Sequence, residues 1–218
     1  AMAGGSDIAR NVSHLVLLNS DFASMPKAVA EGRKAINNIQ RSASLFLTKT
    51  IYSFLLAILF FMIPAPYPFI PIQMTLISAV TIGIPSFVLA LEPNREKIKG
   101  NLFTNIVSKS LPAALTVICS LMACVGIYLL FDIPIERYSA LTVISTGVIG
   151  IMLIYNISIP FNNLRKTLFY SVILLLFAGI LCFSSLLQIE PLNYINILIL
   201  IPLIMASKIV YNGISKIN

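Results

Sequence analysis

Residues 45–63, LFLTKTIYSFLLAILFFMI, hold a single charged side chain, Lys49, within a continuous apolar run. At 1.5 Å per residue, a helix of this length crosses the hydrocarbon core of a bilayer, which is about 30 Å thick. The whole chain of 218 residues is similar, because 58% of its residues are hydrophobic and 11% are charged. Soluble domains carry roughly 25% charged residues. The composition therefore excludes a soluble globular protein and predicts an integral membrane protein.

Five further apolar runs have similar lengths. They are continuous rather than alternating, which favours helices over the strands of a transmembrane barrel. We therefore predict an all-α polytopic membrane protein with six transmembrane helices, at residues 45–63, 69–91, 111–131, 140–160, 168–187 and 195–211. Lys208 interrupts the last run, but a lysine near a helix end can extend its ammonium group to the lipid headgroups.

The basic residues predict the orientation of the chain. Of 15 Lys and Arg residues, 12 lie before the first span, after the last, or in the two loops on that same side, and Lys208 lies near the end of the last span on that side. The loops on the opposite side hold only Arg137, and Lys49 lies within a span. Because loops rich in Lys and Arg stay in the cytoplasm, both termini are predicted to be cytoplasmic. We expect an integral protein of a bacterial plasma membrane, with the lipid bilayer as a partner and no nucleic-acid partner.

The first 44 residues differ from the rest. Ser6 or Asp7 and then Asp21 are candidate helix caps, and Leu15–Leu18 predicts a short buried strand. A helix then begins near residue 24 and is predicted to continue without a break into the first span. Because a helix, a strand and a helix cannot bury a core alone, we expect residues 1–23 to be the end of a larger α/β domain. Residues 24–44 would be a cytoplasmic stalk, and residues 45–218 a membrane domain.

The order of several motifs resembles the C-terminal part of P-type cation-transporting ATPases (E1-E2 ATPases). The similarity covers about residues 1–95, and its motifs are GSDIA at 5–9, VLL at 16–18 with DF at 21–22, VAEGR at 29–33, NNI at 37–39, IPIQ at 70–73, GIP at 83–85 and LEP at 91–93. The resemblance implies that residues 1–23 end a HAD-like phosphorylation domain and that the six spans are the last six of the family.

The resemblance also implies what a full-length parent would contain. ATP and Mg²⁺ would be cofactors of that parent, and the actuator, nucleotide-binding and phosphorylation domains would be partners of this chain. The family's DKTGT, TGES and TGDGVND motifs are absent from the sequence. We therefore expect this chain to bind no cofactor, to contain no catalytic residue and to be inactive alone, within a parent that couples ATP hydrolysis to transport of a cation, such as calcium or another metal cation.

Polar residues on the first two spans are the candidate ion pathway. The resemblance places Thr50 and Ser53, and then Ser78 and Thr81, at or near positions where family members carry ligating side chains. Lys49 and Ser53 are four residues apart and share one helix face, which we expect to lie against Gln73, Ser78 and Thr81. The spans contain no Asp or Glu. A calcium ion takes six to eight oxygen ligands, whereas these spans offer only hydroxyls, Gln73 and backbone carbonyls, so the sequence does not predict a calcium site built on carboxylates and leaves the metal unspecified.

Gly83 and Pro85 complete the candidate site. Pro85 lacks an amide donor and clashes with the carbonyl of Thr81, so the second span should kink or unwind there. Unwound carbonyls at mid-membrane can coordinate a cation; an ordinary kinked span is the simpler alternative. Likewise, Lys49 is either a functional charge or a lysine that extends to the headgroups.

Two other functions fit the same sequence. Spans without carboxylates and with one lysine would also suit a P-type transporter of lipids or polyamines. A free-standing six-span permease is the third possibility.

Overall fold

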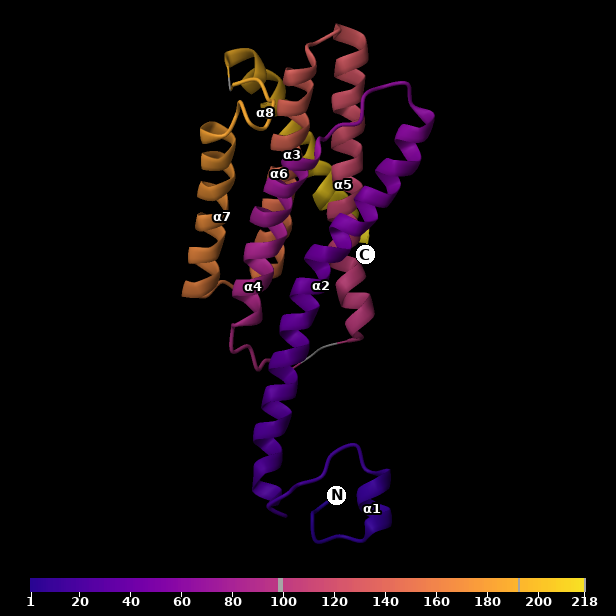
Figure 1. Cartoon of the computed structure of the whole chain (residues 1–218), viewed down its shortest axis with the longest axis vertical. Helices are drawn as coiled ribbons and strands as arrows, with labels where there is room; N and C mark the ends of the chain where they lie inside the picture. Colours follow the sequence, from indigo (N-terminus) through magenta and orange to yellow (C-terminus); the bar gives the residue numbers. More distant parts are fainter. Residues whose placement is uncertain (98–99, 192, 218) are drawn as a thin grey trace.

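The structure is a computed structural model that describes residues 1–97, 100–191 and 193–217. Its helices are α1 (Asp7–Val12), α2 (Met25–Met62), α3 (Pro71–Ser78), α4 (Ile84–Ala90), α5 (Leu102–Phe131), α6 (Ile135–Ser158), α7 (Asn163–Cys182) and α8 (Tyr194–Ile217). A 3₁₀ turn, η1 (Phe22–Ser24), precedes α2, and a π-helical turn, η2 (Ala79–Gly83), joins α3 to α4. Successive spans run in opposite directions through one bundle (Figure 1).

The six predicted spans are confirmed within the described part of the chain. Six helices there are long and apolar enough to cross a membrane, with α3, η2 and α4 acting together as one span of 20 residues. Some predicted bounds shift, because α5 begins at Leu102 and α7 ends at Cys182. At Gln188, beyond the end of α7, the backbone is left-handed, with φ 51°.

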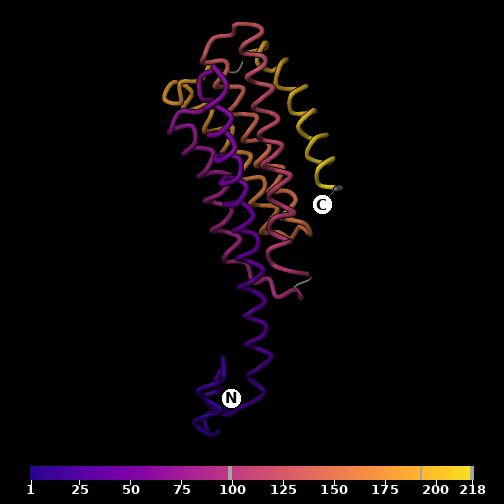
Figure 2. The backbone as a smooth tube through the Cα atoms, turned by 90° about the vertical axis from the view of Figure 1, so that its right-hand side faces the viewer, coloured from indigo at the N-terminus to yellow at the C-terminus, as the bar shows by residue number. Residues whose placement is uncertain are grey.

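Helix α2 is continuous over 38 residues, from Met25 to Met62. At 1.5 Å per residue it is about 57 Å long, which is nearly twice the thickness of a hydrocarbon core. Its first turns project from the bundle, and the N-terminal segment lies at their far end (Figure 2). The predicted uninterrupted passage from stalk to first span is therefore confirmed. Pro26 suits the start of the helix, where its missing amide has no intrahelical partner.

The predicted buried strand at Leu15–Leu18 is wrong for this structure, and an α/β arrangement is not found in the described residues. Leu17 forms one isolated bridge with Met2, and Leu18 is 84% exposed. The physical reason is that a strand needs neighbouring backbone and a covering layer, which the described residues do not supply here. The two caps do form, since Ser6 accepts a hydrogen bond from the Ala9 amide and Asp21 accepts one from the Ala23 amide.

Helix α6 is the most buried span, and it packs against α5, α7, α8 and η2. Two of its glycines allow close contact with neighbouring elements. A Cβ atom at Gly147 would lie 2.6 Å from Leu176 on α7, and one at Gly150 would lie 2.9 Å from the Thr81 side chain. Small residues at helix interfaces let backbones approach in membrane bundles. Gly150 thus brings η2 directly onto α6, beside the candidate site.

Candidate functional site

Lys49 connects the first two spans directly. Its ammonium group donates a hydrogen bond to the Ser78 hydroxyl over 2.6 Å, and both side chains are partly buried. About two turns toward the stalk, the Ser42 hydroxyl donates to the Ser86 carbonyl over 3.4 Å. Lys49 and Ser42 of α2 therefore both contact the second span, and part of the lysine's charge is stabilised by a hydroxyl oxygen.

The second span contains a local change of helix type at the predicted break. The Ile84 amide donates to the Ala79 carbonyl, five residues earlier, so one turn is widened to a π-helix before Pro85. Such π-turns are frequent at functional sites. The chain stays helical through Pro85, which means that the break is a widened turn and not an unwound segment. Thr81 lies within the turn, where its hydroxyl donates to the Ile77 carbonyl over 2.7 Å.

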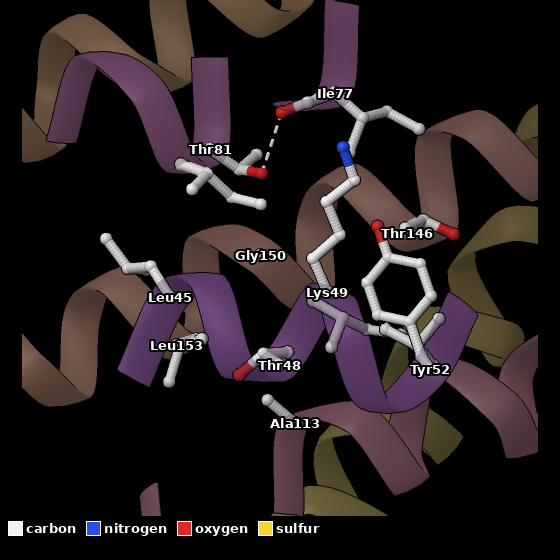
Figure 3. A pocket seen from close by; sticks show the side chains of 13 residues that line it. Leu45, Thr48, Lys49, Tyr52, Ile77, Thr81, Ala113, Thr146, Gly150 and Leu153 are labelled. Carbon is white, nitrogen blue, oxygen red and sulfur yellow. Dashed lines mark hydrogen bonds between the residues drawn. The ribbon is translucent and has the colours of Figure 1, made fainter. Parts of the chain in front are cut away.

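A cavity of about 20 Å³ lies beside this turn, enclosed by side chains from α2, α3, η2, α5 and α6 (Figure 3). Lys49 and Tyr52 reach into it from α2, and Thr146 lines it from α6. The hydroxyls of Tyr52 and Thr146 are buried and have no hydrogen-bond partner among the described residues. A space of this size holds roughly one water molecule, which needs two to four polar partners. The cavity is thus small and mostly apolar, with a few hydroxyls and the Lys49 side chain in its wall.

The structure brings some predicted site residues together and leaves others apart. Lys49, Ser78 and Gly83 line one open groove of about 430 Å³ between α2 and the second span, and Lys49 and Thr81 line the small cavity. The Ser53 hydroxyl is buried one turn above Lys49 and has no partner among the described residues. Pro85 is buried below the π-turn and acts on the shape of the helix.

Thr50 and Gln73 are placed elsewhere. Thr50 is exposed and its hydroxyl donates to the Phe46 carbonyl of its own helix. Gln73 is fully buried, but its amide is already used: its oxygen accepts from the Ile70 amide and its nitrogen donates to the Leu187 carbonyl over 2.7 Å. Gln73 therefore fastens the outer start of α3 to the segment after α7. We call the interface of α2 with α3 and η2, around Lys49, Ser78 and Thr81, the seam. Neither Thr50 nor Gln73 faces it.

A metal ion finds few ligands within this chain. The described residues contain no group of three or more His, Cys, Asp or Glu side chains placed to hold a metal. The seam offers hydroxyl oxygens and a lysine, which repels a cation. Because a calcium ion takes six to eight oxygens, these residues alone do not form a complete calcium site.

A buried ionic cluster at the stalk end of the bundle was not predicted from the sequence. Glu92, only 3% exposed, accepts hydrogen bonds from Arg41 of α2 and from Arg165 of α7, the latter over 2.8 Å. Asn162 also donates to the carboxylate, and Asn38 donates to the Glu92 carbonyl over 2.9 Å. We call Asn38, Arg41, Glu92, Asn162 and Arg165 the ionic clamp. It joins α2, the segment after α4 and the start of α7 at one point.

The clamp keeps Glu92 ionised. Burial raises the pKa of this carboxyl, but the hydrogen bond from Arg165 and the charge of Arg41 lower it, and the net pKa lies below the ordinary value. Two arginines around one carboxylate leave the clamp with a net positive charge. A signal was available in the sequence, since these three residues lie at the same predicted side of three spans. Their pairing, however, depends on how the helices pack, because Arg41 is 51 positions and Arg165 is 73 positions from Glu92 in the sequence.

Comparisons with known proteins find relatives that match about half of this chain. No family model matches the chain. It is 44% identical over 127 residues to the calcium-transporting ATPase CtpE of Mycolicibacterium smegmatis, a stretch of 54% of this chain and 16% of that protein. It is 41% identical over 132 residues to the probable cation-transporting ATPase exp7 of Streptococcus pneumoniae, or 56% of this chain and 17% of that protein. A calcium-transporting ATPase of Bacillus subtilis is 31% identical over 88 residues, 40% of this chain and 10% of that protein.

These similarities confirm the resemblance found in the motifs. The chain is an integral membrane protein by its helices, and it is related to the C-terminal region of P-type cation-transporting ATPases. The matched stretches span less than a fifth of the length of these relatives.

Proposed function

We propose that this chain is the membrane-domain portion of a P-type ATPase that uses ATP hydrolysis to move a cation across a bilayer. The observation that carries the proposal is the continuity of α2, which extends as one rigid helix from outside the bundle to the seam that contains Lys49. The relatives named as calcium- or cation-transporting ATPases support the same activity.

In this proposal α2 is a lever whose fulcrum is the ionic clamp. Asn38 and Arg41 lie one turn apart on α2 and tie it to the segment after α4 and to α7. A force on residues 25–36, which lie on the stalk side of the clamp, would move the part of α2 on the other side. That movement would shift Lys49 relative to Ser78 and the π-turn, and would open the seam to one membrane face or the other.

ATP chemistry is not assigned to the residues of this chain. The described residues contain no group of three or more His, Cys, Asp or Glu side chains placed to hold a metal, and the sequence lacks the phosphorylation motif. ATP and Mg²⁺ would be bound by actuator, nucleotide-binding and phosphorylation domains of the parent protein. The contribution of this chain is then mechanical and electrostatic: it transmits movement along α2 and presents a positive charge that helps to displace a bound cation.

The distribution of basic residues supports an orientation with both termini in the cytoplasm. The stalk side of the clamp would then face the cytoplasm, where ATP is available. Relatives from bacteria support a bacterial plasma membrane.

Transport by the full-length protein in inside-out vesicles tests this function. ATP-dependent uptake should be measured for calcium and a panel of other cations, with a variant that lacks the phosphorylated aspartate as the control. The expected result is uptake of a cation that requires both ATP and that aspartate. Stimulation of ATP hydrolysis by lipids or polyamines, and not by metal ions, would support the alternative cargo. Cation flux that needs no ATP would support a permease and contradict the proposal.

A further inference from the structure

A second groove, of about 470 Å³, lies on α6 between α7 and α8 and is separate from the seam. Val148, Ile151 and Met152 line its apolar end, near the middle of α6. Asn156, Lys208 and Asn212 line its other end, toward the C-terminal ends of α6 and α8. The groove is therefore amphipathic along its length, with apolar side chains at mid-membrane depth and polar side chains toward one membrane face.

Lys208 supplies the positive charge of this groove. It is exposed, and it forms no hydrogen bond or salt bridge with any residue in the described part of the chain. The residues that line the groove include no Asp or Glu. A cation within an apolar span is costly unless it finds a partner. The polar end of the groove therefore has a positive charge and hydrogen-bond donors, and no side chain that lines the groove supplies a negative charge.

The sides of the groove are built from aromatic and amide groups. Tyr155 of α6 stacks edge-on against Phe169 of α7, with ring centroids 5.8 Å apart. The Asn156 amide donates to the Tyr211 hydroxyl over 2.6 Å and ties α6 to α8 at the polar end. Tyrosine side chains such as Tyr155 and Tyr211 are enriched at the level of lipid headgroups. The groove is thus held open by fixed contacts among three helices.

We propose that this groove binds one anionic phospholipid. An acyl chain lies along Val148, Ile151 and Met152, and the phosphate group accepts hydrogen bonds from Lys208 and Asn212. Basic pockets between transmembrane helices recognise anionic headgroups through this chemistry. The anionic lipid comes from the membrane leaflet on the side of the chain termini. This lipid site does not depend on the proposed transport, because its groove shares no residue with the seam.

Lipid binding to the full-length protein in detergent tests the proposal. Thermal unfolding should be followed while phosphatidylglycerol, phosphatidylcholine or inorganic phosphate is added. Phosphatidylglycerol is expected to raise the melting temperature saturably, and the other two are expected to have little effect. Lys208→Gln should weaken the apparent affinity for phosphatidylglycerol about fivefold, as loss of one lysine near an anionic lipid does. Lys216→Gln removes the same charge from the same helix outside the groove and should bind like the unmodified protein.

A second pair of variants tests the acyl-chain end. Met152→Trp fills the groove and should abolish stabilisation by phosphatidylglycerol, whereas Met205→Trp, at a site 63% exposed, should not. The melting temperature without added lipid shows whether each variant folds. The proposal is overturned if the two lysine variants bind alike, if Met152→Trp binds normally, or if phosphatidylcholine or inorganic phosphate reproduces the stabilisation.

Discussion

The Lys49 ammonium group on α2 donates a hydrogen bond to the Ser78 hydroxyl on α3 over 2.6 Å. One contact therefore links the helix that emerges from the bundle with the span that contains the π-turn. The lysine makes this interface positively charged, in spans that contain no Asp or Glu. In the proposed transport cycle, these two residues move relative to each other.

Replacement of Lys49 by Met should reduce cation-stimulated ATP hydrolysis by the full-length protein about tenfold or more. The reason is that the proposed cycle breaks and remakes this contact. A hydrogen bond to a charged group contributes about 1.5–3 kcal/mol, and 1.4 kcal/mol corresponds to a factor of ten in a rate. Lys27→Met removes the same charge from an exposed position on the stalk and serves as the control. Equal activities of the two variants would show that the contact has no role in the cycle.

A methyl group at Gly150 should disturb the π-turn. The added Cβ would lie 2.9 Å from Thr81, so η2 and α6 must separate. We expect Gly150→Ala to lower the free energy of unfolding by about 1–3 kcal/mol, which is typical of overpacking, and to impair transport. At Gly126 of α5 an added Cβ meets nothing within 4 Å, so Gly126→Ala should be neutral or stabilising. Denaturant unfolding in detergent measures both, and similar losses of stability would contradict the proposed close contact.

Replacement of Glu92 by Gln should destabilise the fold strongly. The change leaves Arg41 and Arg165 buried without their carboxylate, and breaking a buried ion pair in this way costs about 3–5 kcal/mol. Glu31→Gln is the matched control, because Glu31 pairs with Arg95 and Lys34 at the exposed surface of the stalk. Surface pairs contribute little. Thermal unfolding in detergent should therefore separate the two variants clearly, and equal melting temperatures would exclude the clamp as a stabilising feature.

The stabilisation by Glu92 should depend on pH in one direction. Its pKa is lower in the folded protein than in the unfolded chain, where a glutamate has a pKa of about 4.3. The contribution is therefore complete above that unfolded value and is lost as the pH falls through the lower folded value. The difference in melting temperature between the unmodified protein and Glu92→Gln should stay constant near neutral pH and shrink in acid. A difference that grows in acid would refute the assigned direction.

The sequence predicted the spans and the continuity of α2 because hydropathy and helix length are local properties. It did not predict the true surroundings of residues 15–18, because a strand is defined by neighbours that hydropathy does not reveal. Thr50 shows a second limit: it is adjacent to Lys49 in sequence, but a rotation of about 100° per residue turns it away from the seam.

Gln73 and the clamp show a third limit. Gln73 donates to Leu187, which is 114 residues away, and Glu92 meets Arg165 across 73 residues. Pairing over such separations depends on how the six spans pack around α6. The distribution of Lys and Arg predicted on which side of the membrane each end of a span lies, but it could not identify which side chains would meet there.

The most direct test of the lever is to interrupt α2 on the stalk side of the clamp. Two glycines inserted after Gly32 should leave ATP hydrolysis by the full-length protein measurable and lower cation uptake per ATP about tenfold, within the about 5–150-fold range of typical coupling energies. Gly32→Ala, where an added Cβ meets nothing within 4 Å, tests whether the position itself tolerates change. Uptake per ATP that falls only in the insertion variant is the predicted result. Uptake per ATP that equals that of the unmodified protein would contradict the claim that α2 transmits the movement.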